Sequence, residues 1–225
     1  MNVNIVNTRG NKSAETSNSK VLHEIFKGIE NTRSTHHKAA SSNEIIYSTI
    51  NHDGQDSYSV IIYAECVTNH TADSITKFLN SLSTLEFDIL YLCRWGDKCH
   101  LYDSYQVLEG FNIYRTYYPT GLIAFIISPS GKKKLLEDED LFTSQNIGSY
   151  IKSMINKGQL VAKTVSPNMF DFDFKYSRRK EDYNMLNQCE TSETNSDNSN
   201  SMGYGIVILI IVLIALFVAY RTSRS

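Results

Sequence analysis

Apolar positions in the N-terminal third of the chain alternate between helical and extended spacing. Residues 3–6 suit a short first strand, and residues 19–29 carry apolar side chains three or four positions apart, which is typical of an amphipathic helix. The polar segment 31–43, which contains paired histidines, is expected to be a loop. Residues 44–50 and 57–64 are rich in β-branched and aromatic side chains, with turn-forming residues between them, so they are predicted to be two strands.

A strand, a helix and a second strand are predicted within residues 57–92. Residues 71–85 place isoleucine, phenylalanine and leucine at helical intervals, and residues 87–92 return to a continuous apolar run. A strand, a helix and a strand within about 35 residues form a βαβ unit, whose two strands are parallel by default.

The second half of the domain continues the alternation of strands and helices. Residues 122–127 form a further apolar strand, and Ser128 is placed to cap a helix that starts near Lys132. A short helix fits residues 147–157. Strands and helices that alternate in this way predict an α/β domain with a mostly parallel sheet flanked by helices.

The most apolar segment of the chain is residues 202–220, which contain no charged side chain. As a helix this segment would be about 28 Å long, which matches the roughly 30 Å hydrocarbon core of a membrane. Tyr204 and Tyr220 stand near its ends, as aromatic residues do at membrane interfaces. We therefore expect one C-terminal transmembrane helix, preceded by a flexible polar stalk at 188–201 and followed by a short tail at 221–225.

The position of this helix predicts a tail-anchored protein with residues 1–187 as its folded domain. The N-terminal residues lack the roughly 7–15 apolar positions of a signal peptide. A helix so close to the C-terminus would leave the ribosome only after synthesis ends, so the domain is expected on the cytosolic side. Arg221 and Arg224 after the helix, and acidic residues before it, favour the opposite orientation, but two arginines are a slight bias.

Composition narrows the function classes. The chain has 225 residues, 41% of them apolar and 20% charged, which corresponds to one or one and a half ordinary domains. A formal net charge of −2 argues against nucleic acid as a partner, because binding to phosphates normally needs a basic face. The sequence has neither a Gly-x-Ser-x-Gly motif nor a glycine-rich phosphate loop, so hydrolase and kinase functions find no support.

Four segments follow one another in an order known from one enzyme family. Residues 60–67 look like a strand that leads into an acidic Glu-Asp-Asp motif, and residues 87–92 are similar to an Asp-hydrophobic-Leu-Tyr-Leu strand. Residues 121–136 combine an apolar run, a serine, a glycine and a helix with paired leucines, and residues 169–173 lie where the domain closes. Over residues 57–173 the chain thus resembles glycosyltransferase family 25, the lipopolysaccharide-type galactosyl- and glucosyltransferases. The resemblance implies a GT-A-like fold with a mostly parallel sheet flanked by helices.

The family's chemistry needs more carboxylates than this chain offers. An active member would hold a UDP-sugar with Mn²⁺ or Mg²⁺, and such hard cations need closely spaced oxygen ligands. Aligned on the strand, the acidic triplet falls on Ala64, Glu65 and Cys66, so one carboxylate remains. Active catalysis would therefore require Glu65 together with a distant acid such as Asp88 or Asp97. The missing carboxylates favour a degenerate domain that needs neither metal nor cofactor.

Basic side chains are the remaining candidates for ligand binding. Without a metal, a diphosphate would need a cationic clamp, and a sulfated glycan would need a basic patch. The candidates are Arg94, Lys132, Lys133, Lys134, Arg178, Arg179 and Lys180. A run of lysines at the start of a helix is also typical of a solvated surface, which stays the alternative.

One cluster of cysteine and histidine residues is a candidate for a metal site or a disulfide. Cys93, Cys99 and His100 form a Cys-x5-Cys-His motif, which supplies three ligands at an unusual spacing and lacks a second pair. We therefore expect no zinc site. A local disulfide between Cys93 and Cys99 is geometrically possible but unusual in reducing cytosol, and reduced thiols are the alternative.

A second resemblance concerns the whole arrangement. Envelope proteins of poxviruses and other large DNA viruses pair a degenerate GT-A domain with a C-terminal membrane anchor and no signal peptide. This resemblance implies a place in a virion membrane, or on the cytosolic face of an internal membrane, and attachment to sulfated cell-surface glycans. Two functions stay open: a membrane-anchored glycan-binding or structural module, and an active family-25 transferase that moves a sugar from a nucleotide sugar to a membrane-associated acceptor. The incomplete acidic triplet favours the first.

Overall fold

A computed structural model describes most of the N-terminal part of the chain. The described residues are 1–7, 22, 24–27, 33–38, 42–52, 56–63, 66–93, 105–117, 119, 121–144 and 146–172. The chain divides into two units, Met1–Asn187 and Gln188–Ser225, and every described residue belongs to the first. None of the helices in the described ranges is long and apolar enough to cross a membrane. The predicted stalk, transmembrane helix and tail lie outside these ranges.

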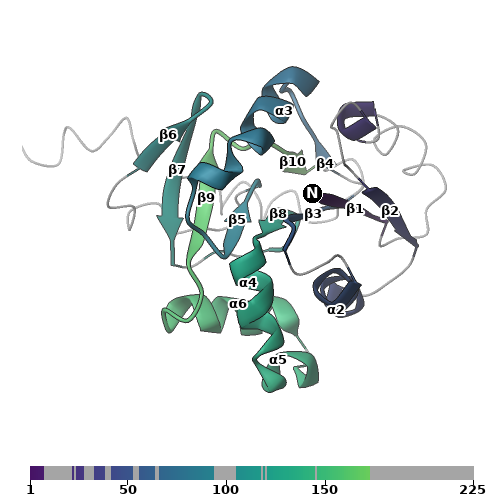
Figure 1. The fold of residues 1–225 in the computed structure, drawn as a ribbon, viewed down its shortest axis with the longest axis vertical. Coiled ribbons are helices and arrows are strands. Elements are labelled where there is room, and N and C mark those ends of the chain that lie inside the picture. Colours follow the sequence, from purple (N-terminus) through teal and green to yellow (C-terminus); the bar gives the residue numbers. More distant parts are fainter. Residues whose placement is uncertain are drawn as a thin grey trace, which may run out of the picture. The chain divides into compact units, whose positions relative to one another are not determined.

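An eight-stranded sheet forms the centre of the described part, in the order β2-β1-β3-β8-β5-β9-β7-β6 (Figure 1). Its strands are β1 (Asn2–Asn7), β2 (Arg33–Lys38), β3 (Ser59–Tyr63), β5 (Ile89–Tyr91), β6 (Tyr105–Leu108), β7 (Phe111–Thr116), β8 (Ala124–Ile127) and β9 (Ala162–Ser166). A second, two-stranded sheet pairs β4 (Cys66–Val67) with β10 (Asp171–Phe172) in antiparallel register.

Strand direction in the large sheet is mixed. β1 pairs in parallel with β2 and β3, and β5 pairs in parallel with β9. β8 lies between β3 and β5 and is antiparallel to both. The two strands of the predicted βαβ unit therefore point the same way but are not neighbours, and the sheet is less parallel than we expected. All four residues of β8 are buried, which suits a central strand with a hydrogen-bonded neighbour on each side.

Helices cover both faces of the sheet (Figure 1). They are α2 (Ser42–His52), α3 (Ala72–Asn80), α4 (Pro129–Leu136), α5 (Glu139–Thr143) and α6 (Ile147–Asn156), with a 3-10 turn at Leu82–Thr84. Apolar residues of α3 and of the helical residues 22 and 24–27 pack with one face of the strands, and those of α2, α4, α5 and α6 pack with the other. The observed fold is thus mixed α/β, with a core on each face of the sheet.

The segment 44–50 is helical, and our prediction of a strand was wrong. Ile45, Ile46, Thr49 and Ile50 are buried in α2 as two adjacent pairs one helical turn apart. Such spacing buries one side of a helix, whereas a strand would bury alternate positions. The β-branched composition misled the prediction because burial against the sheet outweighs intrinsic propensity.

The polar segment 31–43 contains a strand where we expected a loop. β2 includes His36 and His37 and pairs in parallel with β1. The apolar pattern also did not predict β6, β7 and β9, which add three strands on one side of β5. By contrast, the expected first strand, the helices at 71–85 and 147–157, and the strands at 57–64, 87–92 and 122–127 are all present within a few residues of their expected bounds.

Candidate functional site

Asp88 stands at the amino end of β5 and is 2% exposed. Its Oδ1 accepts a hydrogen bond from the Ser130 hydroxyl at 2.8 Å. Its Oδ2 accepts from the Lys134 ammonium and from the Val161 backbone N–H, both at 2.7 Å. Three donors, one of them charged, therefore hold both oxygens of this buried carboxylate in place.

The backbone around Asp88 is equally constrained. Its N–H donates to the Val161 carbonyl at 2.8 Å, and its own carbonyl accepts from the Ser128 N–H at 3.0 Å. Ser128 also caps α4, as the sequence predicted, because its hydroxyl accepts from the Gly131 N–H. A Cβ on Gly131 would collide with the Asp88 carbonyl, so only glycine lets α4 approach β5 this closely. Asp88 is thus the point where β5, α4 and the turn before β9 meet.

Asp88 lies at the amino end of its strand and not at the carboxyl end. It immediately precedes β5, which points the same way as β3. Ligands of open α/β sheets bind at the carboxyl ends of strands. Asp88 is therefore at the opposite end of the sheet from the expected site. Glu65 and Asp97 themselves lie outside the described residues.

Cys66, at the third position of the acidic triplet, is buried in the core. It is 1% exposed, and its thiol donates to the Ile123 carbonyl with an Sγ–O distance of 3.8 Å. Nearby, the Thr68 hydroxyl donates to the Met169 carbonyl at 2.7 Å, next to the β4–β10 pair. Contacts at this end of the sheet tie residues 66–70 to residues 168–171, which is where the sequence placed the closure of the domain.

The three consecutive lysines of α4 do not share one surface. Lys132 is fully buried, Lys134 pairs with Asp88, and Lys133 is exposed. Consecutive helical residues point about 100° apart, so a triplet cannot line a single face. Only Lys133 and part of Lys134 remain within reach of a large ligand. The other basic candidates, Arg94, Arg178, Arg179 and Lys180, lie outside the described residues, as does Cys99; Cys93 is buried at the end of β5.

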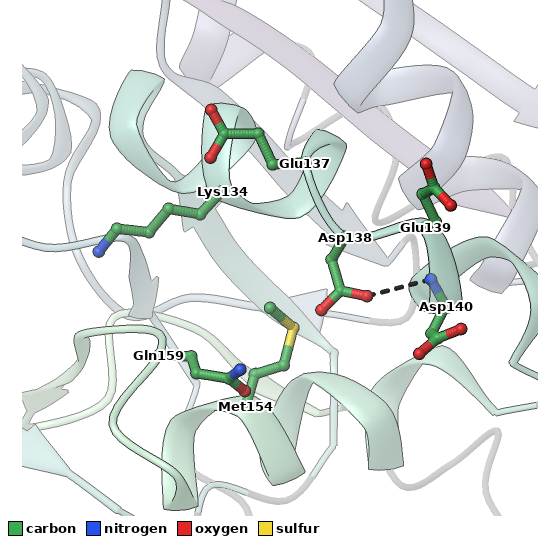
Figure 2. Close-up of a pocket in the computed structure, with 7 residues that line it drawn as sticks. All are labelled: Lys134, Glu137, Asp138, Glu139, Asp140, Met154 and Gln159. Carbon is green, nitrogen blue, oxygen red and sulfur yellow. Dashed lines mark hydrogen bonds between the residues drawn. The ribbon is translucent and has the colours of Figure 1, made fainter.

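A cavity of about 530 Å³ lies beside Lys134 (Figure 2). Its lining consists of Lys134, Glu137, Asp138, Glu139, Asp140, Met154 and Gln159. Four carboxylates and one ammonium, itself paired with Asp88, make this cavity electronegative, so it repels a diphosphate or a sulfated glycan.

One of the four acidic lining residues, Asp138, has a structural role. Its Oδ1 accepts from the backbone N–H of Asp140 and of Leu141 and so caps α5. The same oxygen accepts from the Tyr150 hydroxyl at 2.9 Å. This hydrogen bond raises the pKa of Tyr150 above its ordinary value of 10.0, and burial raises it further. Among the residues that the structure describes, no group of three or more His, Cys, Asp or Glu side chains is arranged to hold a metal ion.

Comparison with known proteins shows distant structural similarity alone. No protein-family model and no curated protein matches the chain. An apo UDP-glucose pyrophosphorylase is similar with a TM-score of 0.38 and 11% identity, over 76% of this chain and 74% of that one. A UDP-glucose pyrophosphorylase complexed with UDP-glucose has a TM-score of 0.41 and 13% identity, over 85% and 81% of the two chains.

A third solved structure is a 4-diphosphocytidyl-2C-methyl-D-erythritol synthase from Anaerococcus prevotii. Its TM-score is 0.34 and its identity 10%, over 83% of this chain and 96% of that one. The three solved structures are distantly similar to this chain in structure alone, and no activity of theirs is assigned to it.

Proposed function

We propose that the domain is a glycosyltransferase-like module that binds a partner and does not transfer sugar. The observation that carries this proposal is the state of Asp88, the one candidate catalytic acid that the structure describes. Its carboxylate is buried and engaged by Ser130, Lys134 and Val161. A catalytic or metal-binding role would require these donors to be displaced, which would leave an ammonium and a backbone N–H without their acceptor.

The position of Cys66 supports the same proposal. In an active family member this position would carry a carboxylate next to the donor sugar. Here a thiol is directed to a backbone carbonyl in the core. A thiol is a poor ligand for Mg²⁺ or Mn²⁺, and a buried one cannot reach a solvent-exposed ion.

We further propose where the domain is anchored and which ligand it binds. Residues 202–220 are proposed to anchor the domain to a virion membrane or to the cytosolic face of an internal membrane. Sulfated glycans are the proposed partner. Because Lys132 is buried, a basic patch would have to rest on the remaining candidates, which are Arg94, Lys133, the exposed part of Lys134 and the segment 178–180.

Two assays on the full chain test the proposal. The first measures transfer of labelled sugar from UDP-sugars, with and without Mn²⁺, by the wild type and by Glu65→Gln. We expect no transfer by either protein. Transfer by the wild type that Glu65→Gln abolishes would overturn the proposal and establish the active transferase instead.

The second assay measures retention on immobilised heparin. Serine replacements at 178–180 together with Lys133→Ser are expected to abolish retention, because exposed cations supply such affinity and salt screens it within about 8 Å. Lys132 is left unchanged because its replacement would disturb the core. Wild-type protein that passes through at low salt would remove the sulfated glycan from the proposal.

A further inference from the structure

Two cations far apart in sequence are direct neighbours in the sheet. β7 and β9 lie side by side (Figure 1). Their antiparallel register places Arg115 opposite Lys163. Side chains directly opposite one another lie on the same face of a sheet, and like charges in this arrangement are destabilising. The pair lies at the amino end of β9, remote from the carboxyl end of β3.

Among the described residues, the positive charges of Arg115 and Lys163 have little compensation. Arg115 is exposed and Lys163 is half-buried. In the described ranges neither side chain forms an ion pair within 4.0 Å, and Glu86 acts on Lys163 only through a longer-range attraction. The Arg115 guanidinium lies 5.1 Å from the centre of the Tyr117 ring, so the ring holds it in place.

The pKa of Lys163 reflects this environment. Burial lowers it below the ordinary value of 10.5, the attraction of Glu86 raises it in part, and the repulsion of Arg115 lowers it again. An anion between the two cations would oppose both lowering effects. Two cations placed opposite one another in the sheet therefore favour an anionic ligand between them.

We propose that Arg115 and Lys163 form a binding site for a phosphate group, either free or as a monoester. The guanidinium offers a planar fork of donors and the ammonium a point charge, so the two side chains can hold different oxygens of a tetrahedral group. Two positive charges also match the charge of about −1.5 to −2 that a phosphate monoester carries at neutral pH. A sulfate ester or a carboxylate carries only one negative charge.

This inference goes beyond the proposed function, because it adds a second anion site that is separate from the basic residues proposed for a sulfated glycan. The site uses neither the lysine triplet nor the acidic cavity. It also needs no sugar-transfer chemistry, so occupancy by phosphate and transfer of sugar are measured separately.

The test is competitive acetylation of lysines in the full chain, with mass spectrometry as the readout. Lys163 labelling is followed against pH while inorganic phosphate, glucose 6-phosphate or methyl sulfate is titrated at constant ionic strength. We expect both phosphates to raise the pKa of Lys163 saturably, with methyl sulfate at least about tenfold weaker. Binding of inorganic phosphate alone would assign the site to the free ion, and binding of both would assign it to phosphate groups in general.

Three variants make the test specific. Arg115→Gln is expected to abolish the phosphate-dependent change, and Arg115→Lys to weaken it, since the fork is lost while the charge remains. Lys157→Gln removes another exposed charge outside the pair and should leave the change intact. Circular dichroism checks that each variant is folded, which we expect because Arg115 and Lys157 are exposed.

No saturable change in the wild type, an equal change in Arg115→Gln, or equal affinity for methyl sulfate would overturn the phosphate site. These outcomes leave the proposed function standing. If the protein both transfers sugar and binds phosphate at Arg115 and Lys163, the proposed function would be overturned and the phosphate site would be retained.

Discussion

The Lys134 ammonium lies 2.7 Å from the Asp88 carboxylate and joins the outer side of α4 to the amino end of β5. The Asp88 side chain is 3% exposed and the Lys134 side chain 42% exposed. The pair is therefore asymmetric, because water can replace the ammonium but not the carboxylate. This asymmetry predicts that replacing Asp88 lowers the stability of the fold more than replacing Lys134.

Asp88→Asn is expected to lower the free energy of unfolding by about 3–5 kcal/mol, since it leaves a donor amide among donors and removes the counter-charge of Lys134. Lys134→Met should lower it by only about 1–2 kcal/mol, because Ser130 and the Val161 N–H remain as donors. Urea unfolding monitored by circular dichroism measures both. Lys133→Met, an exposed neighbour, serves as the control and should change stability by less than about 0.5 kcal/mol. Full stability of Asp88→Asn would contradict the structural role of this carboxylate.

Gly131→Ala should destabilise the domain by about 2–4 kcal/mol, because its Cβ would collide with the Asp88 carbonyl and push α4 from the sheet. Glycine to alanine inside a helix otherwise stabilises by roughly 0.5–1 kcal/mol. Gly148→Ala in α6 is the matched control, since its Cβ would meet only side-chain atoms, Leu122 Cδ1 at 3.4 Å and Asn146 Oδ1 at 3.5 Å, and no backbone. Thermal unfolding compares the two variants. Equal effects would show that α4 does not depend on this close approach.

Tyr150 predicts a change of stability at alkaline pH. Its pKa is raised in the folded state by the hydrogen bond to Asp138, so the protonated hydroxyl is favoured by folding. The stabilisation is present below the unfolded value of about 10 and is lost as pH rises through the folded pKa. The stability difference between wild type and Tyr150→Phe, measured by urea unfolding, should therefore shrink above pH 10. A difference that stays constant at higher pH would mean that the bond does not couple to ionisation.

Deletion of residues 202–225 is expected to release the protein from membranes. The deleted part includes the longest uncharged apolar segment of the chain, which alone has the length to span a bilayer. Carbonate extraction followed by sedimentation compares the full chain with the truncated one. A second variant, with three lysines in place of leucines or isoleucines within 206–216, should behave like the deletion. A truncated protein that still pellets with membranes would contradict the proposed anchor.

Several elements followed from residues close in sequence. The apolar spacing of α3 and α6, the continuous apolar runs of β5 and β8, and the cap at Ser128 depend on neighbours within about one or two turns. For the candidate site, local sequence patterns predicted only the positions of the candidate acids along the chain. The burial of Asp88 was not, because its three donors come from residues 42 to 73 positions away.

The sequence by itself determined where helices and strands alternate and which segment is long and apolar enough for a membrane, because both depend on local spacing and hydropathy. Only the tertiary structure decided that residues 44–50 are a helix and that β8 separates β3 from β5. It also decided that Lys132 is buried and that Arg115 lies opposite Lys163 on the neighbouring strand. Each of these outcomes depends on burial and strand pairing between distant segments, and such long-range contacts leave no periodic signal in the chain.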